Sequence, residues 1–258
     1  MHSQSYLRFY HGGRLLTFAC NSVHTRLLST STSSSSSSSR PNLMDPFSEP
    51  NKKTVQSKLD TVKPVRNNWI AGGTTAAAAV LVPLCICDGE PCILYTLRSS
   101  KLVQHRGEVS FPGGKVDASD TDVIHTAVRE AEEEIGLDPT SSVDMWGQLS
   151  PLPSRDGKMA ITPIICNIGS VDIHSLVPNK DEVEQVFTEK LDTLCDSARL
   201  GFTQYRSAGG YTLPVFHGMN HRIWGLTAII THQLLGILAP THYRHKLKFI
   251  LPLLKVRR

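Results

Sequence analysis

The stretch Gly107–Leu137, GEVSFPGGKVDASDTDVIHTAVREAEEEIGL, joins a glycine-rich turn to an acidic helix, and it decides the fold of this chain. An α-helix advances about 100° per residue, so Glu130, Glu133 and Glu134 share one face. Glu132 points elsewhere. Three carboxylates on one face repel one another unless a cation lies between them, and oxygen-only ligands of this kind suit Mg²⁺ or Mn²⁺. An acidic run on a helix is more often a solvated face. The residues around it must therefore show whether these glutamates form a metal site.

The helix is expected to run from about Asp120 or Thr121 to Ile135. Asp120 is a good N-cap, and Asp122 in the first turn suits the helix dipole. Gly136 is the residue type expected just after a helix C-terminus. The face opposite the glutamates is apolar and should be buried, and it consists of Ala127, Ala131 and Ile135.

Two glycines ahead of the helix and an arginine within it complete a recognisable pattern. The stretch resembles the Nudix box, G-x5-E-x7-R-E-U-x-E-E-x-G-U, where U is a bulky apolar residue. The matching residues are Gly114, Arg129, Glu130, Glu133, Glu134, Gly136 and Leu137. The sequence departs from the box in three ways. The Gly114-to-Arg129 spacing is one residue longer, Asp120 stands near the place of the first Glu, and Ala131 is small for its apolar position.

The resemblance implies an α/β protein with the Nudix fold, an α/β/α sandwich around a mixed β-sheet. It implies that Glu130, Glu133 and Glu134 are catalytic and bind Mg²⁺ or Mn²⁺, with Glu130 and Glu134 as the principal ligands. Arg129 would hold these glutamates by charge pairing. One of the glutamates, or a loop carboxylate, would be the general base. Glu182 and Glu184 can approach the site from a loop, although such residues are more often solvated.

A second motif lies just upstream of the box. The coenzyme A pyrophosphatase branch of Nudix hydrolases carries approximately L-L-T-x-R-S-x3-R-x3-G-x3-F-P-G-G and has the same longer spacing. The matching residues are Leu94, Thr96, Arg98, Ser99, Gly107, Phe111, Pro112, Gly113 and Gly114. Tyr95 replaces a leucine, and Val103 replaces the second arginine. We therefore expect a member of this branch, from a plant organelle, that cleaves coenzyme A or acyl-CoA to 3′,5′-ADP and 4′-phosphopantetheine or its acyl form.

Substrate-binding residues follow from the same stretch. Arg98, at the end of a predicted strand, can clamp a phosphate with two hydrogen bonds, or it can pair with an acid of the domain. Gly113 and Gly114 let the backbone turn sharply and approach a ligand. The 3′-phosphate of coenzyme A calls for a basic cluster, for which the candidates are Lys101, His105 and Arg106.

Two other functions stay open. A Nudix pyrophosphatase can act on another nucleoside diphosphate derivative, such as a nucleotide sugar, a dinucleotide or a damaged nucleotide. A non-catalytic module that binds a nucleotide or protein is the other, although it would not need an intact set of box charges.

Charge is distributed unevenly along the 258 residues. The chain has 27 basic and 23 acidic residues, and residues 1–44 hold four arginines without any Asp or Glu. The rest is therefore neutral, and nothing in it suggests a nucleic-acid partner. We predict a transit peptide and Ser-rich disordered linker at 1–44, an N-terminal extension at 45–67 and the Nudix domain at 68–254. The predicted location is the mitochondrion, with a plastid as the alternative because of the seven serines Ser33–Ser39.

The remaining chain predicts further elements. Residues 51–62 suggest a short amphipathic helix. Strands are expected over Thr74–Ile86, Cys92–Arg98, Val143–Leu152, Met159–Ile168 and Tyr211–Phe216, and Leu191–Cys195 should form a helical turn. Cys85 and Cys87 should face the same side of their strand as small apolar residues. Ile223–Leu238 is too short and polar for a membrane span and favours a helix packed on the sheet. The sequence does not predict the oligomeric state.

Overall fold

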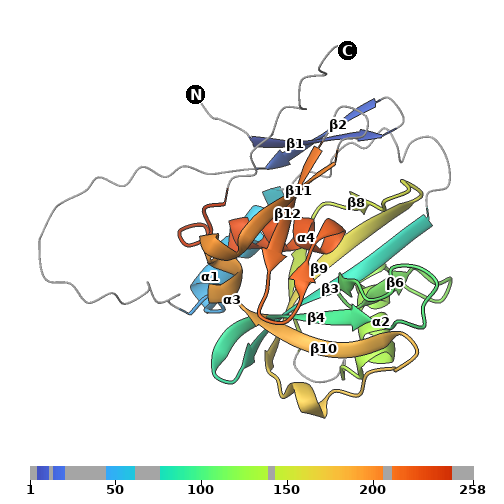
Figure 1. Ribbon diagram of the computed structural model, residues 1–258. Coiled ribbons are helices and arrows are strands. Elements are labelled where there is room, and N and C mark those ends of the chain that lie inside the picture. Colours follow the sequence, from blue (N-terminus) through green and yellow to red (C-terminus); the bar gives the residue numbers. More distant parts are fainter. Residues whose placement is uncertain are drawn as a thin grey trace, which may run out of the picture.

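The computed structural model describes residues 5–11, 14–20, 45–61, 76–138, 143–205 and 211–245. Its centre is a mixed sheet with helices against both faces, which is the predicted α/β/α arrangement (Figure 1). The five main strands run in the order β10 (Val183–Lys190), β4 (Glu90–Arg98), β3 (Ala76–Cys87), β9 (Met159–Ser170) and β7 (Asp144–Gln148). β3 and β9 are parallel, and the other neighbouring pairs are antiparallel. Three short strands pair with interior strands of this path: β5 (Val109–Ser110) with β4, β6 (Gly113–Lys115) with β3, and β8 (Leu152–Pro153) with β9.

The nearly continuous apolar run of β3 is explained by burial on both faces. Successive side chains of a strand point to opposite sides. Leu81 and Cys85 therefore pack towards α2 (Val123–Ile135), while Val82 and Leu84 pack towards α4 (Gly225–Leu238) on the other face. The register of β3 against β9 shifts just after Leu84, next to Pro83. Cys85 and Cys87 are both buried on the α2 face, as predicted.

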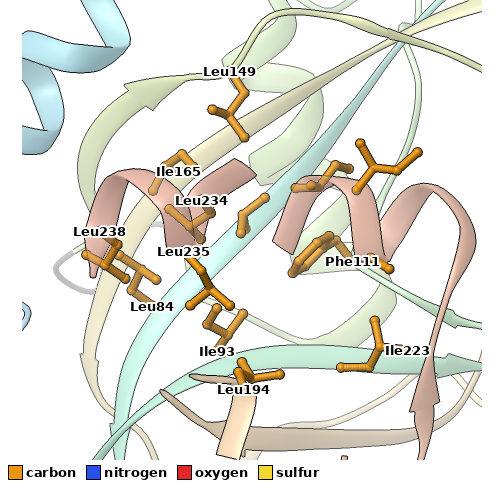
Figure 2. Close-up of a cluster of buried hydrophobic side chains, with 14 of the residues drawn as sticks. Leu84, Ile93, Phe111, Leu149, Ile165, Leu194, Ile223, Leu234, Leu235 and Leu238 are labelled. Atoms are coloured by element: carbon orange, nitrogen blue, oxygen red, sulfur yellow. The ribbon is translucent and has the colours of Figure 1, made fainter. Parts of the chain in front are cut away.

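The larger core lies between the sheet and α4. Figure 2 shows Leu234, Leu235 and Leu238 of α4 among strand residues such as Leu84 and Ile93. Each of these side chains is at most 2% exposed, and burying one such side chain contributes about 1.5–3 kcal/mol. The apolar C-terminal stretch is therefore a core helix, as predicted, and no helix in the described ranges has the length and apolar character needed to cross a membrane.

The predicted N-terminal helix is present as α1 (Glu49–Thr61). Val55 and Leu59 are 0% and 5% exposed and belong to the same core as α4. Lys52 pairs with Asp144 of β7 at 2.7 Å. The segment predicted as an extension thus packs against the domain. The predicted boundaries at residues 44, 67 and 254 lie outside the described residues.

The second half of the chain adds elements that the sequence did not indicate. A three-stranded sheet consists of β11 (Leu200–Tyr205), β12 (Tyr211–His217) and β13 (Arg222–Ile223), of which only β12 was predicted. α3 (Leu191–Cys195) is the predicted helical turn, and two 3₁₀ turns occupy Ile173–Ser175 and Ser197–Arg199. Near the N-terminus, β1 (Ser5–His11) and β2 (Arg14–Cys20) pair as a hairpin. The predicted Ser-rich linker at 21–44 lies outside the described residues.

One predicted strand is wrong in length. Val143–Leu152 was expected to be continuous, but β7 ends at Gln148 and β8 begins at Leu152. The register against β9 shifts between Met145 and Gly147, where Gly147 has a φ of 140°. β7 still pairs with β9 as far as Gln148, and a proline at 151, in the gap before β8, has no N–H to donate to a ladder.

Candidate active site

The box helix α2 begins two to three residues later than predicted. Asp122, and not Asp120, is the N-cap, because its Oδ1 accepts hydrogen bonds from the N–H groups of Ile124 and His125, both at 2.8 Å. The helix ends at Ile135 as expected. Gly136 follows with φ 67° and ψ 30°, and its N–H bonds to the Glu132 carbonyl. The assignment of Asp120 as the helix cap was therefore wrong.

Asp120 instead anchors Arg129. Its carboxylate accepts two hydrogen bonds from the guanidinium, Nε to Oδ1 at 2.9 Å and Nη2 to Oδ2 at 3.0 Å. Oδ2 also accepts from the Asp117 N–H and the Thr126 hydroxyl. The Asp120 side chain is fully buried. The hydrogen bonds from Arg129 are the main reason that the pKa of this carboxyl lies far below its usual value.

Arg129 also reaches two glutamates of the box, as predicted. Its Nη2 lies 3.1 Å from Glu130 Oε1 and its Nη1 lies 3.0 Å from Glu133 Oε2. The Glu133 side chain is 59% exposed, whereas that of Glu130 is 16% exposed. Glu133 therefore lies at the outer margin of the site, and its assignment as a supplementary metal ligand stays a prediction.

The two adjacent glycines fit against different neighbours. The N–H of Gly113 donates to Glu134 Oε2 at 3.2 Å. Gly113 has a φ of 153°, and a Cβ there would lie 2.3 Å from the carbonyl oxygen of Ala79 in β3. A Cβ on Gly114 would lie 2.3 Å from Glu130 Oε1. The absence of a side chain at Gly113 thus lets the turn pack closely on β3, and its absence at Gly114 leaves space for the Glu130 carboxylate.

Glu134 is the buried carboxylate of the site, with only 3% of the residue exposed. Burial raises the pKa of Glu134 to about 8, and the charges of Glu130 and Glu182 also raise it, while the Gly113 N–H and Arg98 lower it. Burial likewise raises the pKa of Glu130, and the nearby charges of Glu133 and Glu182 raise it further against the effect of Arg129. These carboxylates are held together with too little positive charge around them, which is the electrostatic condition that a divalent cation relieves.

The positive charge of Arg98 acts on Glu134 and lowers the pKa of that carboxyl against the effect of burial. Arg98 ends β4, where its backbone pairs with Val183 of β10 and with Gly107 and Glu108 of the following loop. Its Nε is buried without a hydrogen-bond partner among the described residues. A guanidinium with an unused donor next to the carboxylates suits an incoming phosphate oxygen.

The other basic candidates lie on the exposed loop between β4 and β5. Lys101 pairs with Asp181 at 2.8 Å, and both side chains are largely exposed. His105 Nδ1 lies 2.9 Å from Glu108 Oε2, and Arg106 is exposed. Lys101 and His105 thus each pair with a different carboxylate, and the contact of Lys101, His105 and Arg106 with a 3′-phosphate stays a prediction.

The donor set fits a hydrated Mg²⁺ or Mn²⁺ better than a fully protein-bound ion. Within the described ranges, no three His, Cys, Asp or Glu side chains meet as a group able to hold a metal ion. Glu130 and Glu134 lie one helical turn apart and interact electrostatically. Mg²⁺ sites that process phosphates commonly use one or two carboxylates, several waters and the substrate itself. Glu130 and Glu134 can supply such a pair.

Comparison with known proteins shows the family of this chain. The NUDIX domain model matches residues 75–199. The mitochondrial coenzyme A diphosphatase NUDT8 of Mus musculus is 51% identical over 175 residues, which cover 67% of this chain and 82% of the mouse protein. The human protein of the same name is 47% identical over 175 residues, covering 67% and 73%. Nudix hydrolase 3 of Caenorhabditis elegans is 39% identical over 189 residues, covering 67% and 77%.

Proposed function

This chain belongs to the Nudix family, and on that premise we propose that it is a metal-dependent diphosphatase of coenzyme A and acyl-CoA. The products are 3′,5′-ADP and 4′-phosphopantetheine or its acyl form. One observation supports the proposal beyond the family: the charge of Arg98, from the upstream motif, acts on Glu134 of the box. We therefore infer that the two motifs that together resemble the coenzyme A branch contribute to one site.

Different residues of the site are proposed to bind the metal, position its ligands and bind the substrate phosphate. Glu130 and Glu134 would hold the Mg²⁺ or Mn²⁺, which when bound neutralises the pyrophosphate and lowers the pKa of an attacking water. Arg129 keeps Glu130 in place and is itself held by Asp120. Arg98 binds a phosphate oxygen through its unused donor. This orients the pyrophosphate bridge towards the carboxylates before the chemical step.

Substrate selectivity is assigned to the loop between β4 and β5. Lys101 and Arg106 would contact the 3′-phosphate that distinguishes coenzyme A from most other nucleotides. Lys101 is tied to Asp181 in the structure, so the phosphate has to replace that carboxylate. Because the pair is exposed, its loss costs at most about 1 kcal/mol.

A mitochondrial location is proposed for the same chain. The mouse and human relatives are named as mitochondrial, and residues 1–44 have the arginine-rich, acid-free composition of a presequence. A fluorescent fusion of residues 1–44 tests the address. A signal confined to mitochondria agrees with it, whereas a plastid or diffuse signal contradicts it. The plant origin stays a prediction.

The activity is tested with a substrate panel. The purified protein from residue 44 onward is incubated with coenzyme A, acetyl-CoA, a nucleotide sugar and a dinucleotide, each with Mg²⁺, Mn²⁺ or EDTA. Products are identified by mass spectrometry. We expect metal-dependent release of 3′,5′-ADP from the coenzyme A compounds and a loss of turnover by orders of magnitude in Glu134→Gln. Preferred cleavage of another substrate would contradict the coenzyme A assignment, and no metal-dependent activity at all would favour a binding module.

A further inference from the structure

Positive and negative charges are separated along this chain. All 23 Asp and Glu residues lie between Asp45 and Asp196, together with 14 of the Lys and Arg residues. Residues 197–258 carry nine Lys and Arg and no Asp or Glu. The part of the chain that holds the box glutamates is therefore strongly acidic, and the C-terminal part is strongly basic. A long basic stretch without acids is typical of a surface that meets an anionic partner.

The fold gathers basic side chains at one end of the three-stranded sheet. Arg199, just before β11, donates from Nη1 to the His217 carbonyl of β12 at 3.4 Å. His217 pairs with Arg222 in the β12–β13 register, and Arg222 Nη2 donates to the Thr203 hydroxyl of β11 at 3.2 Å. Arg199, His217 and Arg222 thus form one group, which we call the basic end of this sheet.

Carboxylates do little to neutralise the basic end. Arg199 Nε lies 3.9 Å from Asp196 Oδ2, and both side chains are more than a third exposed, at 38% and 40%. Such an exposed pair contributes little and stays open to exchange of partners. Arg222 is exposed, and among the described residues its guanidinium donates to a hydroxyl and not to a carboxylate. Its positive charge therefore remains available to a partner outside the chain.

The turn between β12 and β13 presents an apolar side chain beside these charges. Met219 in this turn is 64% exposed. Its N–H donates to both carboxylate oxygens of Glu189 in β10, at 2.8 and 3.1 Å, and Glu189 is only 1% exposed. A Cβ on Gly218 would collide with the same carboxylate. A buried group therefore fixes the backbone of the turn, while the methionine side chain stays in solvent.

The sequence that follows has the same chemistry. His245, the last described residue, stacks on Phe202 of β11 with ring centroids 5.2 Å apart. Residues 246–258, KLKFILPLLKVRR, then supply five Lys and Arg and seven bulky apolar residues. Basic residues interleaved with bulky apolar ones suit an anionic lipid surface, where the charges meet headgroups and the apolar groups enter the interface. A nucleic acid would use the charges but not the aliphatic side chains.

We propose that the basic end of the sheet, with Met219 beside it and residues 246–258 continuing it, docks on a bilayer that contains anionic phospholipid. Each Lys or Arg held at such a surface strengthens binding about fivefold. The acidic part of the chain is repelled by the same surface, so the carboxylates of α2 face away from the bilayer. This inference concerns a surface remote from the reaction and does not depend on the proposed substrate.

The test is co-sedimentation of the full chain with vesicles of phosphatidylcholine, with or without phosphatidylglycerol. We expect binding only to the vesicles with phosphatidylglycerol, and its loss at high salt. The double variant Arg199→Gln/Arg222→Gln should weaken binding at least about tenfold, with an unchanged circular dichroism spectrum. Met219→Ser and a chain ending at His245 should also bind more weakly. Arg155→Gln removes an exposed arginine of the acidic part and should bind as the wild type does.

Residues 1–44 carry arginines of their own but are the same in all these proteins, so differences between variants report on the C-terminal part. Equal binding to both kinds of vesicle, or to neither, would overturn the proposal. An equal loss in Arg155→Gln and in the double variant would assign the effect to net charge and also overturn it. So would displacement of the vesicles by inorganic phosphate at constant ionic strength, or tighter binding of a duplex oligonucleotide that weakens in the same double variant.

Discussion

Asp120 and Arg129 form a two-point ion pair, nine residues apart in sequence, between a buried carboxylate and the arginine of the acidic helix. The pair fixes the plane of the guanidinium, so that its remaining nitrogens reach Glu130 and Glu133. The loop before α2 therefore positions Glu130 indirectly, because Asp120 in that loop holds the guanidinium that pairs with Glu130.

Asp120→Asn should lower kcat for coenzyme A about 10–100-fold, because outer partners that orient metal-site residues typically matter to that extent. The amide keeps the shape but removes the charge that holds both guanidinium nitrogens. Asp117→Asn is the matched control, because Asp117 is exposed and its carboxylate accepts hydrogen bonds from the Ser119 N–H and hydroxyl. Unchanged kcat in Asp120→Asn, measured at saturating metal, would contradict the positioning role of Asp120.

Gly113→Ala and Gly114→Ala should fail in different ways. At Gly113 the new Cβ meets the β3 backbone and φ is 153°, so the free energy of unfolding should fall by a few kcal/mol. At Gly114 the Cβ meets the carboxylate of Glu130, which is a side chain that can move. We therefore expect Gly114→Ala to keep most of its stability and to lose metal affinity.

Urea unfolding and Mn²⁺ titration separate the two effects. Gly236→Ala is the control, because nothing lies within 4 Å of its Cβ position and alanine is favoured over glycine in a helix by about 1 kcal/mol. It should be neutral or slightly stabilising. If Gly114→Ala bound Mn²⁺ like the wild type, the close approach of Gly114 and Glu130 would have no role in metal binding.

The buried carboxyl of Glu134 predicts a pH-dependent stability. Its pKa is raised in the folded protein to about 8, above the ordinary value of 4.5. The folded state therefore retains a proton that the unfolded chain releases, so this contribution is fully present below about pH 4.5 and is lost as the pH rises through 8. Without metal, stability should fall over this range. Glu134→Gln should flatten the fall, because glutamine does not ionise.

Thermal unfolding in EDTA between pH 5 and 8.5 measures this effect. Glu132→Gln, on the exposed side of the same helix, should retain the wild-type slope. Added Mg²⁺ should stabilise the wild type most at the high end of the range, where Glu134 is ionised and able to bind it. A wild-type slope in Glu134→Gln would assign the pH dependence to other groups.

Tyr243 and His232 form a buried hydrogen bond behind the sheet, with Tyr243 Oη 2.6 Å from His232 Nδ1. Burial lowers the pKa of His232 to about 4, so the ring is neutral at physiological pH. Tyr243→Phe leaves the ring nitrogen without this partner, which should cost about 1–3 kcal/mol of unfolding free energy. Activity should persist, because α4 and α2 lie on opposite faces of the sheet.

A double-mutant cycle with His232→Leu isolates this interaction. Once His232 is replaced, the further change of Tyr243→Phe should cost much less, since no buried nitrogen is left unpaired. Purely additive losses, measured by urea unfolding, would show that the two side chains contribute independently.

The sequence predicted local features correctly where residues close in sequence determine the backbone conformation. Gly136 ends α2 as predicted because a left-handed residue is needed within the same turn. The apolar stripe of Ala127, Ala131 and Ile135 is fully buried, as its spacing indicated. The family followed from residues at fixed spacing, Arg129 and the box glutamates among them, and the relatives confirm it.

Predictions that depended on distant contacts were less successful. Asp120 and Asp122 both have the chemistry of a helix cap, and packing against Arg129 assigned the first to an ion pair. Glu182 and Glu184 were equivalent candidates until the β10–β4 register placed a bulge at Glu184. The predicted strand over Val143–Leu152 is divided into β7, which ends at Gln148, and β8, which begins at Leu152.

The sequence by itself determined the chemistry of this protein: an acidic helix behind two glycines, in a spacing that belongs to one family and points to metal-assisted phosphate cleavage. Only the tertiary structure decided which carboxylate is buried and which arginine is anchored. The physical reason is that residue type and spacing set what a side chain can do. Its exposure, its partners and therefore its pKa depend on segments far away in the chain, such as Gly113 beside Glu134 and Ser99 beside Glu182.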